Sequence, residues 1–294
     1  MPDLRNSAAN RALATELRRL REVSGMSGDE VAIALGWSAS KVSRIETNRI
    51  GIKPADLTRL LDLYVVDDAR RGQLTSLSAE PEPRGWWHGY LDSIAPEYAA
   101  YIRQEESAAE LKCWSPELIH GLLQTEDYAT AIMEIYAPAV SHPTPGMIRR
   151  RVEVRMRRQE ILSAADRQFS FILDEAALLH RYGDNDLMQR QLLHINEVSH
   201  RPNVTIRVLA FGGSHPVVSP GSFALLQFAP VHGTPISDIV YVEQLTRNDF
   251  IEDEPATYEY RLAFDRIADG ALDEEASRQL ISRIAAERWA GATT

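Results

Sequence analysis

The chain has 294 residues, 44% of them hydrophobic and 25% charged, a composition and length typical of a globular protein with two domains. Its single cysteine, Cys113, excludes an intramolecular disulfide and a multi-cysteine zinc site. No apolar run approaches the roughly 20 residues of a membrane span, and the first residues lack the apolar core of a signal peptide, so we expect a cytoplasmic protein.

The formal net charge of −10 is unevenly distributed along the chain. Residues 1–78 carry 12 Lys and Arg against 10 Asp and Glu, a net charge of +2. Residues 79–294 carry 20 against 32, a net charge of −12. The first part is therefore free to approach phosphates although the whole chain is acidic.

Two helices are predicted at the start of the chain. Between residues 10 and 23 apolar side chains recur at helical spacing, and Gly25 then ends the helix. Residues 27–30 read S-x-x-E, a capping box in which Ser27 and Glu30 bond free amides of a first helical turn. A short second helix should follow, with its apolar side chains facing inward.

Residues 36–49, GWSASKVSRIETNR, predict a tight turn followed by a third helix. Gly36 supplies the turn, Ser38 caps the helix, and Val42 and Ile45 face inward. The remaining helices of this part are expected over residues 55–65, opened by Pro54, and from Asp67 to about Leu77.

The segment 79–85 combines proline, glycine and acidic residues, which predicts a stiff, exposed linker. Beyond it helices and strands alternate, so we expect an all-α domain over residues 1–78 and a larger α+β domain with a small sheet over residues 86–294. Helices are expected at residues 86–109, 126–136, 144–162, 184–199, 254–268 and 273–289, with a short one from Asp174. Strands are expected at residues 110–114, 168–173, 203–211, 221–228 and 238–245.

Residues 27–48, SGDEVAIALGWSASKVSRIETN, resemble the signature of Xre-type (lambda-repressor-like) helix-turn-helix proteins. The resemblance covers residues 10–65 and implies that the third helix enters the DNA major groove. The alternative is a helical packing domain with charges on a solvated face. By the resemblance, bases are contacted by Ala39, Ser40, Ser43 and Arg44, and phosphates by Ser38, Lys41, Arg49 and Lys53. It also implies a structural ion pair between Arg21 and Glu46.

Two residues depart from that signature. Gly28 replaces a frequent DNA-contacting glutamine, and we expect its backbone N–H near a helix start to hold a phosphate instead. Asn48 replaces a glycine, and asparagine tolerates the left-handed cap conformation. Arg44 is the strongest single candidate for base reading, because arginine bonds guanine O6 and N7 in a bidentate manner.

A net charge of +2 predicts a moderate nonspecific affinity for DNA. One copy of the domain, which contacts only a few base pairs, binds too weakly to select a site in a genome. We therefore expect a homodimer on a pseudo-palindromic site, with recognition helices about 34 Å apart.

The second part resembles the C-terminal domain of a large group of actinomycete Xre-type regulators, a domain of unknown function sometimes described as antitoxin-like. The resemblance covers nearly all of residues 85–288 and implies a small protein partner, without revealing a chemistry. Its segments are GWWHGY (85–90), GLLQTEDYATAI (121–132), FILDEAALLHR (171–181), PNVTIRVLAF (202–211) and GSFALLQF (221–228). His120 stands where the group usually has proline.

We expect no enzymatic activity, no metal and no cofactor. The eight histidines lack metal-site spacing, no G-x-S-x-G or phosphate-loop motif occurs, and GGSH at residues 212–215 indicates a loop. A self-cleaving Ser/Lys domain is improbable, because Lys112 is the sole lysine after residue 53 and the sole Ala–Gly bond joins Ala290 to Gly291.

Two features of the second part suggest a ligand or partner site. Residues 149–158, within the helix expected over 144–162, carry six arginines against the single acid Glu153. This predicts an anion or docking surface or, alternatively, arginines that are solvated or paired with the surplus acids of this domain. Aromatic residues either line a small-molecule pocket or form core. The residues singled out are Trp86, Trp87, Trp114, Gln124, Tyr128, Arg151, Arg155 and Glu175.

The sequence thus favours a dimeric, sequence-specific transcription regulator whose second domain dimerises and senses a ligand or a protein partner. The alternative is an antitoxin-like interaction protein that binds a small partner and uses DNA binding for autoregulation.

Overall fold

The computed structural model describes residues 8–79, 85–140, 143–212, 221–231, 233–244 and 248–290. Most of the predicted linker, residues 80–84, and residues 213–215 of the GGSH loop lie outside this description. The chain divides into two compact units. The N-terminal unit comprises Met1–His88, Ala99–Ser107 and Phe228–Ser237, and the C-terminal unit comprises Gly89–Tyr98, Ala108–Gln227 and Asp238–Thr294.

The N-terminal unit contains the five helices that the sequence predicts. They are α1 (Ala8–Val23), α2 (Gly28–Leu35), α3 (Ala39–Glu46), α4 (Pro54–Leu63) and α5 (Asp68–Ala79). The capping box at α2 forms, since Ser27 N donates to Glu30 Oε2 at 2.7 Å and Glu30 N donates to Ser27 Oγ at 3.2 Å. Gly36 follows α2 in the left-handed conformation, with φ of 64°. Local capping chemistry therefore sets both ends of α2.

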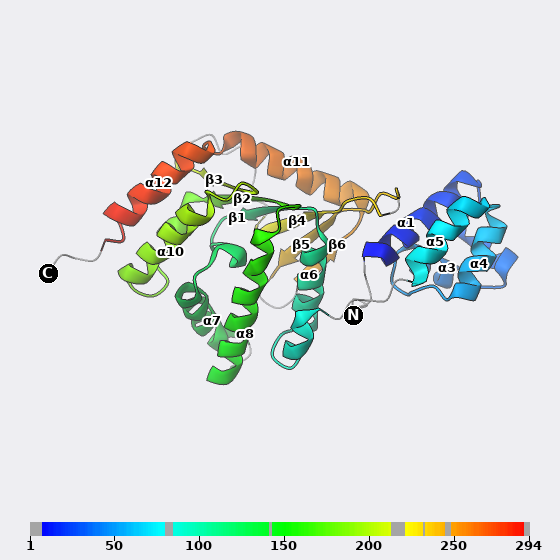
Figure 1. Ribbon diagram of the computed structural model, residues 1–294, viewed down its shortest axis with the longest axis horizontal. Helices are drawn as coiled ribbons and strands as arrows, with labels where there is room; N and C mark the ends of the chain where they lie inside the picture. Colours follow the sequence, from blue (N-terminus) through cyan, green and yellow to red (C-terminus); the bar gives the residue numbers. More distant parts are fainter. Residues whose placement is uncertain are drawn as a thin grey trace. The chain divides into compact units, whose positions relative to one another are not determined.

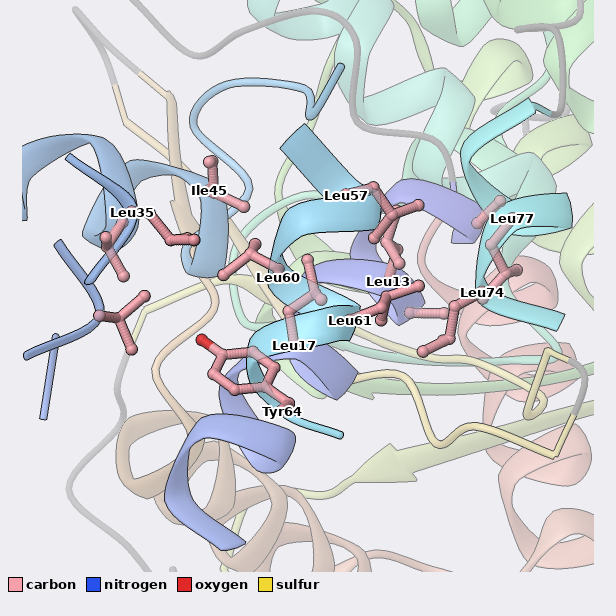
Figure 2. Close-up of a cluster of buried hydrophobic side chains, with 14 of the residues drawn as sticks. Leu13, Leu17, Leu35, Ile45, Leu57, Leu60, Leu61, Tyr64, Leu74 and Leu77 are labelled. Atoms are coloured by element: carbon pink, nitrogen blue, oxygen red, sulfur yellow. The ribbon is translucent and has the colours of Figure 1, made fainter. Parts of the chain in front are cut away.

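All five helices contribute to one hydrophobic core (Figure 2). Burial of each leucine or isoleucine stabilises the unit by about 1.5–3 kcal/mol, an upper estimate since the unfolded chain is already partly compact. The side chains labelled in Figure 2 are Leu13 and Leu17 of α1, Leu35 of α2, Ile45 of α3, Leu57, Leu60 and Leu61 of α4, Tyr64 directly after α4, and Leu74 and Leu77 of α5.

Two segments distant in sequence complete this unit. One is residues 99–107 of helix α6 (Pro96–Ser107), where Gln104 accepts a 2.8 Å hydrogen bond from Arg11 Nη1. The other is Phe228–Ser237, the connection between two strands, which we call the arm. The arm supplies Ile236 to the hydrophobic core, and Thr234 Oγ1 accepts a 2.7 Å hydrogen bond from Arg70 of α5. The N-terminal unit is therefore assembled from three parts of the chain, and its hydrophobic core from two of them, the five helices and the arm.

The C-terminal unit has the α+β architecture that the sequence predicts, and its sheet is mixed. Its strands lie in the order β3-β2-β1-β4-β5-β6, with β1, β2 and β3 parallel and the others antiparallel to their neighbours. They are β1 (Glu110–Ser115), β2 (Gln168–Asp174), β3 (Val204–Leu209), β4 (Phe223–Gln227), β5 (Ile239–Glu243) and β6 (Asn248–Ile251). The sequence does not predict β6, because its four residues show no clear alternation and it gains its hydrogen bonds from β5.

Side-chain caps define most helices of this unit. Thr144, Asp174, Asp184, Asp253 and Asp273 accept hydrogen bonds from first-turn amides of α8, α9, α10, α11 and α12. The helices are η2 (Gly121–Leu123), α7 (Glu126–Val140), α8 (Pro145–Arg158), η3 (Gln159–Ser163), α9 (Glu175–Leu179), α10 (Asn185–Val198), α11 (Glu254–Gly270) and α12 (Glu274–Glu287). The 3-10 helix η1 (Trp86–Tyr90) and α6 occupy the stretch predicted as helical over residues 86–109.

Helices cover both faces of the sheet (Figure 1). On one face, Trp114 of β1 and Phe223 of β4 pack in a cluster with Phe264 of α11. Helices α7 and α8 lie on the other side, where the ring of Phe171 in β2 is 5.3 Å from that of His120. Side chains of the sheet are thus packed on both of its faces.

Candidate nucleic-acid interface

Helix α3 presents a continuous exposed face of small and polar side chains. Val42 and Ile45 are buried in the core, which leaves Ala39, Ser40 and Ser43 exposed together with Arg44. Arg44 Nε donates to Ser40 O at 3.2 Å, so the guanidinium lies along the helix. The four residues expected to contact bases therefore share one exposed face of α3.

Both ends of α3 are fixed by local hydrogen bonds. At its start Ser38 Oγ accepts from Lys41 N at 3.2 Å. At its end Asn48 has φ of 52°, and Arg49 N and Asn48 N donate to Arg44 O and Ile45 O, the paired bonds of a Schellman motif. The left-handed conformation expected of Asn48 is thus present. It directs the chain out of α3 and leaves Arg49 exposed.

The residues expected at phosphates divide into two groups. Ser38, Arg49 and Lys53 are exposed, and Gly28 is the first residue of α2, so its N–H lacks a helical acceptor. Lys41 differs, because its Nζ lies 2.8 Å from Asp56 Oδ2 and 3.7 Å from the centroid of the Trp37 ring.

Arg21 of α1 and Glu46 of α3 form a bidentate ion pair. Their Nε–Oε1 and Nη2–Oε2 distances are 2.7 and 2.9 Å, and Arg21 Nη1 also donates to Met26 O at 3.0 Å. The hydrogen bonds that Arg21 donates to Glu46 raise the pKa of Arg21. Beside the pair, burial raises the pKa of Tyr64, and the charge of Glu46 acts in the same direction. This pair ties the exposed helix α3 to α1.

The residues that surround Lys41 were not predicted from the sequence. Arg59 of α4 donates to Leu35 O at 2.6 Å, which satisfies a carbonyl at the end of α2, and its guanidinium lies 5.6 Å from the Trp37 ring centroid. Asp56 occupies the first turn of α4, where an acidic residue is ordinarily interpreted as a partner of the helix dipole. No local pattern distinguishes that role from an ion pair with α3.

In the C-terminal unit, Gln124 and Arg155 meet, and Tyr128 is buried on the adjoining helix α7. Arg155 Nη1 donates to Gln124 Oε1 at 2.7 Å, and Gln124 Nε2 donates to Ile119 O at 2.7 Å. Burial raises the pKa of Tyr128. Nearby, burial and the charges of two arginines hold the pKa of His120 well below its ordinary value. Gln124 and Arg155 are therefore hydrogen-bonded to each other beside η2.

The other residues singled out in the second part lie elsewhere. Arg151 Nε donates to Ser93 O at 2.8 Å, and Trp114 is buried against α11. Glu175 Oε2 accepts from Phe211 N at 2.6 Å beyond the ends of β2 and β3. Trp86 and Trp87 belong to the N-terminal unit. The eight residues therefore do not form a single site.

The arginines of α8 mainly hold residues 89–98. Arg150 Nη2 donates to Gly89 O at 2.6 Å, Arg151 Nε donates to Ser93 O, and Arg158 Nη1 donates to Tyr98 Oη at 2.5 Å. Glu153, the acid of this helix, accepts from Tyr90 Oη at 2.6 Å. The partners of these arginines are thus mainly backbone carbonyls and a hydroxyl, and Arg150 also pairs with Asp92 at 3.2 Å.

Two further properties concern the described part of the chain. Its helices include none that is long and apolar enough to cross a membrane. Its histidine, cysteine, aspartate and glutamate side chains include no group of three or more placed to hold a metal ion.

Comparison with known families gives two matches. Residues 98–283 match the family described as a domain of unknown function (DUF5753). Residues 12–74 match a family described as a helix-turn-helix domain, and this range contains α2, α3 and the exposed face of α3. Neither a curated protein nor a solved structure matches the chain.

Proposed function

The chain belongs to the DUF5753 family and carries a helix-turn-helix domain before that region, and we propose that it is a sequence-specific DNA-binding regulator of transcription. The helix-turn-helix match carries the proposal, since this domain implies DNA as a partner. The exposed face of α3, with its small residues and Arg44, supports base reading by this helix.

In the proposed complex α3 lies in the major groove. Arg44 bonds guanine O6 and N7, Ser40 and Ser43 donate to or accept from base edges, and the methyl group of Ala39 contacts thymine. A bidentate arginine–guanine pair contributes about 1–3 kcal/mol of discrimination. The ion pair between Arg21 and Glu46 supports this arrangement, because it fixes the orientation of α3 before DNA arrives.

Phosphate contacts set the register of α3 on the duplex. We assign them to the side chains of Ser38, Arg49 and Lys53 and to the backbone N–H of Gly28, all near the ends of α2, α3 and α4. The net charge of +2 over residues 1–78 supports moderate electrostatic attraction, so we propose that a homodimer binds two half-sites.

The C-terminal unit acts in this proposal by dimerising and by binding a ligand or a protein partner, not by catalysis. The arm supports the transmission of such a signal, because it is continuous with β4 and β5 while its side chains lie in the core of the N-terminal unit. A signal then changes the spacing of the two α3 helices, which requires that the bound molecule has different affinities for two states. The antitoxin-like alternative requires a stoichiometric small protein partner whose binding changes operator affinity.

The test is a selection of bound duplexes from a random pool with the purified full-length chain. We expect enrichment of a sequence with two related half-sites and, for Arg44→Ala, a loss of preference at one base pair in each half-site. Arg18→Ala is the matched control, because Arg18 is an exposed arginine of α1 paired with Glu22. Failure to enrich any sequence refutes the proposal. An Arg44→Ala variant with unchanged preference refutes the assignment of α3.

A further inference from the structure

A cluster at the turn between α2 and α3 holds one cation of the DNA-facing surface. Lys41 Nζ lies 2.8 Å from Asp56 Oδ2 and 3.7 Å above the ring of Trp37. Arg59 approaches the same ring, at 5.6 Å from its centroid. Both members of the ion pair are partly buried, with 29% of the Lys41 side chain and 20% of the Asp56 side chain exposed.

This contact distinguishes Lys41 from the cations around it. Arg44, Arg49 and Lys53 have exposed side chains, and none of them forms an ion pair with a described carboxylate. Lys41 lies in the first turn of α3, and Asp56 lies in the first turn of α4. The ion pair thus neutralises a lysine that stands among residues expected to contact DNA.

A lysine in this position gains most from DNA by displacing counterions from phosphates, an attraction that is the same for every sequence. While Asp56 holds Lys41, the pair has no net charge, and transfer of Lys41 to a phosphate leaves a partly buried carboxylate without its partner. The ring of Trp37 further restricts Lys41, because it holds the ammonium by a cation–π contact.

We propose that Asp56 is a specificity-determining residue that restrains Lys41 and thereby lowers sequence-independent attraction to DNA. The proposal rests on the proposed function, since it assumes that α3 faces DNA. Base contacts from the exposed face of α3 then form a larger share of the binding free energy than they do with an unrestrained lysine.

The first experiment compares Asp56→Asn with wild type on the selected operator and on an unrelated duplex, between 50 and 200 mM salt. We expect tighter binding to the unrelated duplex and a smaller ratio of specific to nonspecific affinity. One added phosphate contact steepens the slope of log affinity against log salt concentration by about 0.9. Over this range of salt the variant therefore loses about 3.5-fold more affinity than wild type. Asp62→Asn is the matched control, because Asp62 is also on α4 and pairs with Arg71 instead.

A double-mutant cycle tests whether Asp56 acts through Lys41. In the Lys41→Gln background, Asp56→Asn should no longer tighten nonspecific binding. A gain that persists in this background, or a gain that Asp62→Asn reproduces, overturns the proposal. If wild type shows no preference for any duplex, the proposed function fails instead, so the two failures are distinguishable.

A second comparison does not depend on the folding of the Asp56 variant. Lys41→Gln should change the slope of log affinity against log salt concentration little for nonspecific binding, because Asp56 already neutralises this lysine. Lys53→Gln should reduce the magnitude of that slope by about 0.9. Lys53 is an exposed residue at the start of α4 without a side-chain cap bond. An equal reduction in the two variants shows that Lys41 already reaches phosphates and refutes restraint by Asp56. Thermal melting confirms that each variant is folded.

Discussion

Replacement of Ile236 by alanine should destabilise the helices of the N-terminal unit although the residue lies 157 positions beyond the end of α5. Ile236 is 7% exposed and packs in the same core as the leucines of α1 and α5. Removal of a buried isoleucine to alanine costs about 2–5 kcal/mol, and the exposed fraction places this site near the lower half of that range. A loss of about 3 kcal/mol in the free energy of opening raises the equilibrium constant for opening of the N-terminal unit on the order of a hundredfold.

Hydrogen exchange measured on the full-length chain resolves the effect by segment. Ile236→Ala should increase amide exchange throughout α1 and α5. Ile239→Ala is the matched control, because Ile239 is 1% exposed on β5 and belongs to the C-terminal unit, so exchange should rise in β4 and β5 instead. If Ile236→Ala leaves α1 and α5 as protected as in wild type, the arm does not contribute to that core and the reasoning is refuted.

Three other predictions follow from the N-terminal unit. Arg21→Met should lower the free energy of unfolding by about 2–3 kcal/mol, because it leaves the partly buried Glu46 carboxylate unpaired. Chemical denaturation measures this loss, and an unchanged midpoint contradicts the prediction. Val65→Gly should raise the free energy of unfolding by about 0.5–1 kcal/mol. Val65 is 88% exposed and has φ of 53°, a left-handed backbone conformation that is strained for a β-branched residue. A lower melting temperature of the variant refutes this prediction. Burial acts to raise the pKa of Glu16, but hydrogen bonds from Arg19 and Arg70 outweigh it and lower the pKa. The stabilisation that the ionised Glu16 carboxylate contributes is therefore present above its unfolded pKa of about 4.5 and is lost as pH falls through the lower folded pKa. Glu16→Gln should flatten the acid side of a curve of unfolding free energy against pH.

Much of the helix-turn-helix could be predicted because its signals are local. The capping box, the turn at Gly36, the cap at Ser38 and the left-handed Asn48 each involve bonds that span five residues or fewer. The strands β1 to β5 were likewise predicted from short apolar segments of neighbouring residues, whereas the parallel or antiparallel pairing of these strands was not predicted.

Contacts between distant residues were not predictable in this way. The bond from Arg70 to Thr234 joins residues 164 positions apart, and the pair of Lys41 with Asp56 depends on how α4 crosses α3. The polar residues Gln124 and Arg155 were singled out by type, but their hydrogen bond follows from the packing of α8 beside η2. Periodicity indicates which face of an element is buried, not which element covers it.

The arm also has a consequence during synthesis of the chain. A ribosome releases α1 to α5 long before it reaches Ile236, because the two are separated by more than 150 residues. At translation rates of about 5–20 residues per second, the nascent helices wait on the order of 10–30 s for the last side chain of their core. The nascent chain therefore completes its DNA-binding unit only after most of the C-terminal unit has been made.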